Sequence, residues 1–106
     1  MKINVGVIFG GRSVENEISV ITAAQTMAAM NEDKYNIVPI YISKEGRWYT
    51  GDKLRSTDNY RDMKALLASV EEVYFRPAYG DNSLYKVRKP LFGSAVATTI
   101  DVILPC

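Results

Sequence analysis

The amino-acid sequence predicts an α/β fold with an open, mostly parallel β-sheet that is flanked by helices and carries a β-hairpin insertion. Three observations support this prediction. An apolar run at residues 3–9 precedes two glycines and a helical pattern, and a second apolar run follows at residues 36–42. Strand, helix and strand within about forty residues form a βαβ unit, whose crossover should be right-handed. A third apolar run, at residues 100–105, predicts another buried strand.

The first strand leads directly into the first helix. It is almost wholly apolar, as expected for a central parallel strand that is covered on both faces. Gly10 and Gly11 should end the strand, and Ser13 is suited to cap the helix. Glu15 and Glu17 would then lie near the positive end of the helix dipole. The residues that share one side of this helix at helical spacing are Ile21, Ala24, Gln25 and Ala28, with Val20 and Met27 beside them.

The segment after the second strand has a less regular pattern. We expect a turn and a short edge strand at residues 44–49, and a short helix at residues 60–70. In that helix Met63, Leu66 and Leu67 should face inward.

Two further short strands are predicted at residues 73–75 and 84–87. The residues between them include Gly80, Asp81 and Asn82, a strong turn signal. These two strands form the predicted hairpin insertion.

Composition limits the classes of function. The chain has 106 residues, of which 47% are hydrophobic and 24% charged, in the range of a single globular domain. A net charge of +1 gives no reason to expect nucleic acid or a membrane surface as a partner. No apolar run approaches the roughly 20 residues that cross a bilayer. The first strand begins too early to leave room for a signal peptide, so we expect a cytoplasmic protein.

The absence of histidine and the presence of a single cysteine exclude several kinds of chemistry. The sequence has no histidine, so it cannot supply a Ser-His-Asp or Cys-His relay or a His-ligated zinc site. Its single cysteine, Cys106, excludes an intrachain disulfide and CxxC motifs.

The turn between the first strand and helix is the candidate site. In open α/β sheets, ligands bind outside the carboxyl ends of the strands. Glu15 and Glu17 have two interpretations: both stabilise the helix N-terminus, or one of them anchors a cationic group such as an ammonium. The segment from Gly6 to Ser13 nearly fits a phosphate loop, but Arg12 replaces the required lysine and the residues between the glycines belong to the strand.

Residues 7–20, VIFGGRSVENEISV, closely resemble the opening of D-alanine–D-alanine ligases. Residues 39–49 are similar to the second strand of that family and the turn after it. Residues 101–105 resemble the strand that leads into the family's His-Gly loop. The resemblance is weakest between about Thr50 and Ala97.

This resemblance implies a Rossmann-like domain of the pre-ATP-grasp type. Residues 1–106 would be the N-terminal substrate-binding domain of an ATP-grasp ligase, with the central and C-terminal ATP-grasp domains outside this chain. Such ligases join two D-alanines for peptidoglycan synthesis, and so act in cell wall biogenesis and cell shape. ATP, assisted by magnesium, phosphorylates the carboxylate of the first D-alanine, and the amine of the second attacks the acyl phosphate.

The resemblance also assigns residues. Glu15 matches the glutamate that holds the ammonium group of the first D-alanine, and would be both catalytic and substrate-binding. Ile18 matches an apolar position near the same substrate. ATP and magnesium would be bound by the domains outside this chain, so no cofactor or metal ligand is assigned here. Asn16 stands where family members often carry histidine.

Several alternatives stay open at this stage. The 106-residue chain alone should be inactive, because the resemblance places the parts that bind ATP, magnesium and the second substrate outside it. Such ligases are usually homodimers, and this domain would make part of that contact. Relatives that make D-alanyl-D-lactate or D-alanyl-D-serine share the opening motif. A different possibility is a stand-alone module that binds a small anion or nucleotide at the Gly10-Gly11 turn. A third is a domain whose main property is association of two copies.

Overall fold

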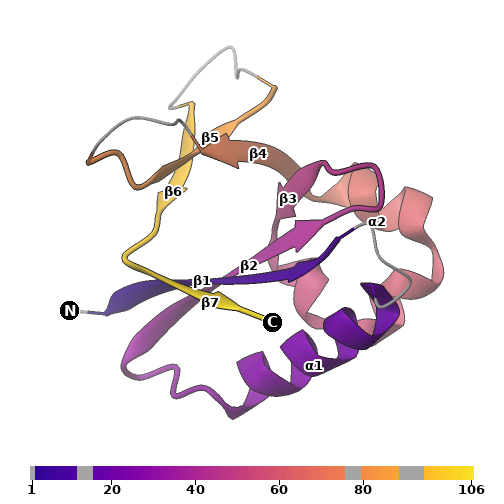
Figure 1. The fold of residues 1–106 in the computed structure, drawn as a ribbon, viewed down its shortest axis with the longest axis horizontal. Coiled ribbons are helices and arrows are strands. Elements are labelled where there is room, and N and C mark those ends of the chain that lie inside the picture. Colours follow the sequence, from indigo (N-terminus) through magenta and orange to yellow (C-terminus); the bar gives the residue numbers. More distant parts are fainter. Residues whose placement is uncertain (1, 12–15, 76–79, 89–94) are drawn as a thin grey trace.

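The computed structural model describes residues 2–11, 16–75, 80–88 and 95–106 (Figure 1). Within these residues one sheet contains β1 (Ile3–Gly10), β2 (Tyr35–Ile42), β3 (Trp48–Thr50), β4 (Glu71–Phe75), β5 (Ser83–Lys86), β6 (Val96–Thr99) and β7 (Val102–Pro105). The helical segments are α1 (Asn16–Ala29), η1 (Asp52–Arg55), η2 (Thr57–Arg61) and α2 (Met63–Ser69). The strand order is β6-β5-β4-β3-β2-β1-β7.

The sheet is mixed and has a parallel half and an antiparallel half. β1 pairs in parallel with β2 and with β7, while the other four pairs are antiparallel. The strand-helix-strand unit of β1, α1 and β2 is therefore confirmed, but the prediction of a mostly parallel sheet is wrong. Most connections in the antiparallel half are too short to carry a crossover, so consecutive strands there lie antiparallel. β3, predicted as an edge strand, lies between β2 and β4.

The two edges of the sheet meet at one corner. β6 and β7 are opposite edges, yet only Ile100 and Asp101 separate them along the chain (Figure 1). The corner is tied to the start of β1. The Asn4 N–H donates to Asp101 Oδ2 at 2.8 Å, the Asp101 N–H donates to the Asn4 carbonyl at 2.8 Å, and Asn4 Nδ2 donates to the Thr99 carbonyl at 2.8 Å. The sheet is therefore curled rather than flat.

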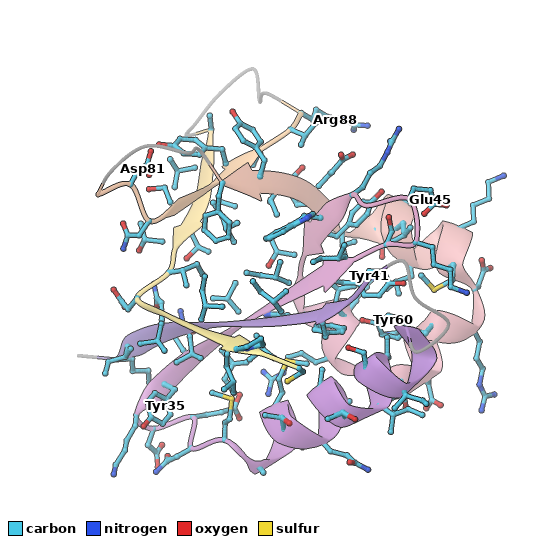
Figure 2. All side chains as sticks on the ribbon, in the orientation of Figure 1. Tyr35, Tyr41, Glu45, Tyr60, Asp81 and Arg88 are labelled. Atoms are coloured by element: carbon cyan, nitrogen blue, oxygen red, sulfur yellow. The ribbon has the colours of Figure 1, made fainter. Side chains whose placement is uncertain are left out.

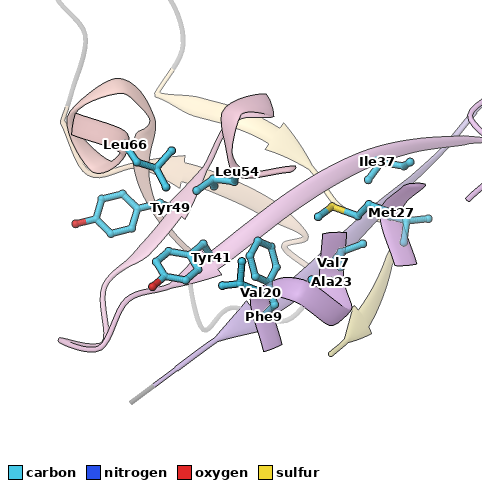
Figure 3. Close-up of a cluster of buried hydrophobic side chains, with 11 residues drawn as sticks. Val7, Phe9, Val20, Ala23, Met27, Ile37, Tyr41, Tyr49, Leu54 and Leu66 are labelled. Atoms are coloured by element: carbon cyan, nitrogen blue, oxygen red, sulfur yellow. The ribbon is translucent and has the colours of Figure 1, made fainter. Parts of the chain in front are cut away.

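Alternate residues of β1 and β2 enter two separate cores, because successive side chains point to opposite faces of a sheet. On the helical side, Val7, Phe9 and Tyr41 pack with residues of α1, η1 and α2 (Figure 3). The second core fills the inside of the curl and consists of Val38, Ile40, Val73, Leu84 and Ile100. The α-helices α1 and α2 thus pack on the same face of the sheet.

Helix α1 buries a different side from the one its spacing indicates. The buried residues are Val20, Ala23 and Met27, whereas Ile21 is 50% exposed and Gln25 is exposed. The predicted cap Ser13 lies outside the described residues. In α2, Leu66 is buried and Met63 and Leu67 pack against the same core, as predicted. No helix in the described ranges is long and apolar enough to cross a membrane.

The last part of the chain departs from the prediction in two ways. Strand β6 has no counterpart in the predicted elements, because its sequence, VATT, lacks a strong apolar pattern. Strand β7 was predicted to be buried, but Val102 is 51% and Ile103 50% exposed. The reason is its position: within the described residues β7 pairs only with β1 and forms an edge of the sheet.

Candidate functional site

The carboxyl ends of the three parallel strands, β1, β2 and β7, lie at the same end of the sheet. This end is called the carboxyl edge, to distinguish it from the outer strands β6 and β7. β1 lies between β2 and β7, and α1 carries the chain from β1 to β2, whereas β7 arrives on the opposite side of β1. The strand order therefore reverses between β1 and β7. In open α/β sheets, ligands bind outside the carboxyl ends at such a switch point. The site predicted from the sequence lies at this edge.

Two glycines let the chain leave β1 at this edge. Gly10 has φ 95° and Gly11 has φ 109°, values that residues with a side chain rarely adopt. The Gly11 N–H donates to the Ile42 carbonyl at 2.8 Å, which ties the turn to the end of β2. A Cβ atom at Gly10 would lie 2.4 Å from the Ile42 carbonyl oxygen, whereas one at Gly11 would meet no described residue within 4 Å. Gly10 is therefore required for packing against the end of β2.

Ser19 connects this turn to the other neighbouring strand. It lies in α1, and its Oγ accepts a hydrogen bond from the Gly10 N–H at 2.9 Å. The same hydroxyl donates to the Cys106 carbonyl at 3.2 Å, just after β7. The sequence pattern does not single out Ser19. The signal available was a serine near the start of a helix that follows a glycine turn, where a short hydroxyl side chain can reach backbone groups.

The structure places only one of the two predicted substrate residues. Ile18 lies in α1 next to Ser19 and is 65% exposed, a large apolar side chain open to whatever approaches this edge. Glu15 lies outside the described residues, as do Arg12 and Ser13. Glu15 keeps its assignment as a prediction.

A cavity of about 390 Å³ opens beside the carboxyl end of β2. Its apolar lining comes from α1, α2 and two tyrosines, and its polar lining includes Lys44, Glu45 and Arg61. Tyr41 and Tyr60 lie edge to face, with ring centroids 5.4 Å apart (Figure 2). Burial, followed by the neighbouring Tyr41, raises the pKa of the Tyr60 hydroxyl. That hydroxyl donates to the Leu54 carbonyl at 2.7 Å, so it supports the fold rather than offering a reactive group.

The described side chains offer a binding edge and lack a catalytic relay. Where the structure describes the chain, no three side chains of His, Cys, Asp or Glu gather closely enough to hold a metal ion. These residues therefore do not fit magnesium, and no chemical step is assigned to a metal on them. What this end of the sheet provides is a glycine turn, an exposed apolar residue, and backbone groups held by Ser19.

Comparison with known proteins gives a consistent result. Residues 4–106 match the family model described as the D-ala D-ala ligase N-terminus. The D-alanine–D-alanine ligase of Geobacillus thermodenitrificans is 38% identical over 108 residues, which cover 99% of this chain and 28% of the relative. That of Bacillus pumilus is 34% identical over 105 residues, covering 99% of this chain and 27% of the relative. The chain thus spans little more than a quarter of the length of these two curated relatives.

Solved structures share the fold. The D-alanine–D-alanine ligase from Coxiella burnetii superposes with a TM-score of 0.71 at 25% identity, covering 96% of this chain and 27% of that one. The VanG D-Ala:D-Ser ligase from Enterococcus faecalis gives a TM-score of 0.73 at 23% identity, covering 99% of this chain and 29% of that one. The second likeness supports the fold alone.

Proposed function

Because the chain belongs to the family of D-alanine–D-alanine ligase N-terminal domains, we propose that it is the substrate-binding domain of an ATP-dependent ligase that joins two D-alanines for peptidoglycan synthesis. The observation that carries this proposal is the family match over residues 4–106. The position of the glycine turn at the switch point of the sheet agrees with it. In this proposal the domain is Rossmann-like, of the pre-ATP-grasp type, with β4 and β5 as the inserted hairpin.

The domain's task is to hold the first D-alanine. We assign its ammonium group to the Glu15 carboxylate, through a charge-assisted hydrogen bond that would contribute about 1.5–3 kcal/mol. Ile18, an exposed apolar residue of α1, suits the methyl group of the substrate. Holding the amino end fixes the direction in which the carboxylate points. The contribution to rate is therefore mainly orientation.

Activation of the carboxylate belongs to other parts of the ligase. ATP and magnesium would supply the acyl phosphate from domains outside this chain, and the amine of a second D-alanine would displace the phosphate. Part of the usual homodimer contact of such ligases would be made by this domain, in the cytoplasm where the precursors are made. The choice among D-alanine, D-lactate and D-serine as second substrate would also lie outside residues 1–106.

Substitution of Glu15 tests the assignment. In the ligase that carries this domain, Glu15→Gln should raise the KM for the first D-alanine by about 10- to 100-fold, because the amide keeps the size of the side chain but loses its charge. ATP binding, measured by calorimetry, should persist.

Glu17→Gln is the matched control, because it makes the same substitution two residues along the sequence at a position to which no substrate contact is assigned. It should leave D-alanine kinetics close to those of the wild type. Unchanged D-alanine kinetics in Glu15→Gln would remove the site assignment. Micromolar ATP binding by the 106-residue chain alone would favour a stand-alone nucleotide-binding module instead.

A further inference from the structure

We propose that Ser19 is a positioning residue for the substrate site, and that its hydroxyl replaces the last rung of the hydrogen-bond ladder between β1 and β7. The inference rests on the proposed function, because it concerns the edge at which the first D-alanine would bind. It adds a residue that neither touches the substrate nor belongs to the predicted carboxylate pair.

The ladder between the two strands shows where the hydroxyl is inserted. The paired residues of β1 and β7 end at Ile8 and Pro105. One bond follows, from the Cys106 N–H to the Ile8 carbonyl at 2.8 Å. In a regular parallel ladder the next bond would run from the Gly10 N–H to the Cys106 carbonyl.

A serine side chain occupies the position of that bond. The Gly10 N–H donates to Ser19 Oγ at 2.9 Å, and Ser19 Oγ donates to the Cys106 carbonyl at 3.2 Å. A hydroxyl can accept and donate at once, so one side chain satisfies both backbone groups. Ser19 thereby bridges two strand ends that are far apart in the sequence.

This insertion has a geometric consequence at the switch point. Two hydrogen bonds in series hold Gly10 and the end of β7 farther apart than one direct bond of about 2.9 Å would. The hydroxyl therefore keeps the carboxyl ends of β1 and β7 separated where a ligand would enter. It also fixes α1 to the glycine turn, one residue from Ile18 and four residues in sequence from Glu15. Loss of the hydroxyl would let the strand ends close and move the turn.

The first experiment compares Ser19→Ala with a matched control in the ligase that carries this domain. Ser19→Ala should raise the KM for the first D-alanine by about 10-fold or more, since small misplacements of a bound substrate are costly. The KM for ATP should stay within about twofold of the wild type. Ser69→Ala is the control: Ser69 Oγ also donates to a backbone carbonyl, that of Leu66, but from α2 and away from the turn. It should change neither constant.

The second experiment separates positioning from general stability. Ser19→Thr keeps the hydroxyl and should restore most of the D-alanine affinity lost in Ser19→Ala. In the 106-residue chain, amide exchange measured by NMR should become faster at Gly10 in Ser19→Ala and stay unchanged in Ser69→Ala, because the Gly10 N–H loses its acceptor.

The outcomes distinguish this inference from the proposed function. Wild-type D-alanine kinetics in Ser19→Ala, or unchanged exchange at Gly10, would overturn the role of Ser19. If Glu15→Gln impairs D-alanine use in the same enzyme, the substrate assignment still holds and only Ser19 is excluded. Equal loss of D-alanine and ATP affinity, in proportion to a lowered Tm, would show a structural role and also overturn the inference.

Discussion

At the scale of single residues, the two glycines of the turn serve different purposes. Both have positive φ angles, but among the described residues only the place of a Gly10 side chain is occupied, by Ile42 and Tyr41. A Cβ atom at Gly11 would meet none of the described residues within 4 Å. The first glycine is therefore required for packing, and the second for its backbone conformation.

Alanine substitutions should separate these purposes. Gly11→Ala should cost about 1–3 kcal/mol in free energy of unfolding, from the backbone conformation alone. Gly10→Ala should cost about 2 kcal/mol more, because its Cβ would lie 2.4 Å from the Ile42 carbonyl oxygen. Urea unfolding of the two variants measures both values. Equal destabilisation would show that the end of β2 moves freely and that the contact at Gly10 is unimportant.

Tyr60 gives the molecule a predictable response to alkali. Burial, followed by Tyr41, raises the pKa of its hydroxyl in the folded state above the ordinary value of 10.0. Between these two pKa values the unfolded chain releases the proton while the folded chain keeps it. The protonated Tyr60 hydroxyl therefore makes its full contribution to the free energy of unfolding below pH 10. That contribution is lost as the pH rises through the pKa of Tyr60 in the folded protein.

Tyr60→Phe isolates this effect. At pH 7 the variant should be less stable by about 1 kcal/mol, because the hydrogen bond to the Leu54 carbonyl is lost. Above pH 10 the wild type should lose stability relative to the variant as the pH rises, because its folded state keeps the Tyr60 proton that the unfolded chain releases. Urea unfolding between pH 8 and about pH 11.5 measures the difference. A constant difference across this range would contradict the prediction.

At the scale of elements, the two sides of α1 carry similar apolar residues, so the sequence pattern hardly distinguishes the buried side from the exposed one. Ile21 and Met27 are both large and apolar, but only Met27 is buried. The buried side follows Val20 and Ala23, and the alanine there lies fully covered against β1. Its small size lets the helix approach the sheet closely, and this matters more than the number of large apolar residues on a side.

A pair of helix substitutions tests this orientation. Met27→Ala should lower the free energy of unfolding by about 2–5 kcal/mol, because it leaves a cavity in the helical-side core. Ile21→Ala should change it by less than about 0.5 kcal/mol, since the side chain is half exposed and alanine favours helices. Urea unfolding checks both. The reverse order of effects would mean that α1 is rotated about its axis in solution.

Elements with strong local signals were predictable, and those that depend on distant partners were not. The apolar run of β1, its glycines and the run of β2 define their own strands and turn. The parallel strand-helix-strand unit therefore followed from the sequence. β6 and the edge position of β7 depend on pairing with strands that are far away along the chain, which no local pattern records. The glycine turn at the carboxyl end of β1 was predictable for the same reason as β1. Ser19 was not, because its partner Cys106 is 87 residues away.

At the scale of the whole molecule, the curled sheet explains how a chain of this size holds two cores. One face of β1 and β2 is covered by α1, η1 and α2, and the other by the antiparallel half of the same sheet. The hydrogen bonds from Asn4 to Asp101 and Thr99 fix the corner where the edges meet. The parallel half carries the glycine turn, and the antiparallel half covers the face on which no helix of the described ranges lies.

The central place of β1 also affects how the protein is made. β1 leaves the ribosome before the other described strands of this sheet, and β7, which pairs with one of its edges, leaves after them. At about 5–20 residues per second, that edge stays without β7 for roughly 5–20 s of synthesis. During this time an apolar strand is exposed to other nascent chains and to chaperones. Completion of the sheet thus waits until residues 102–105 have been translated.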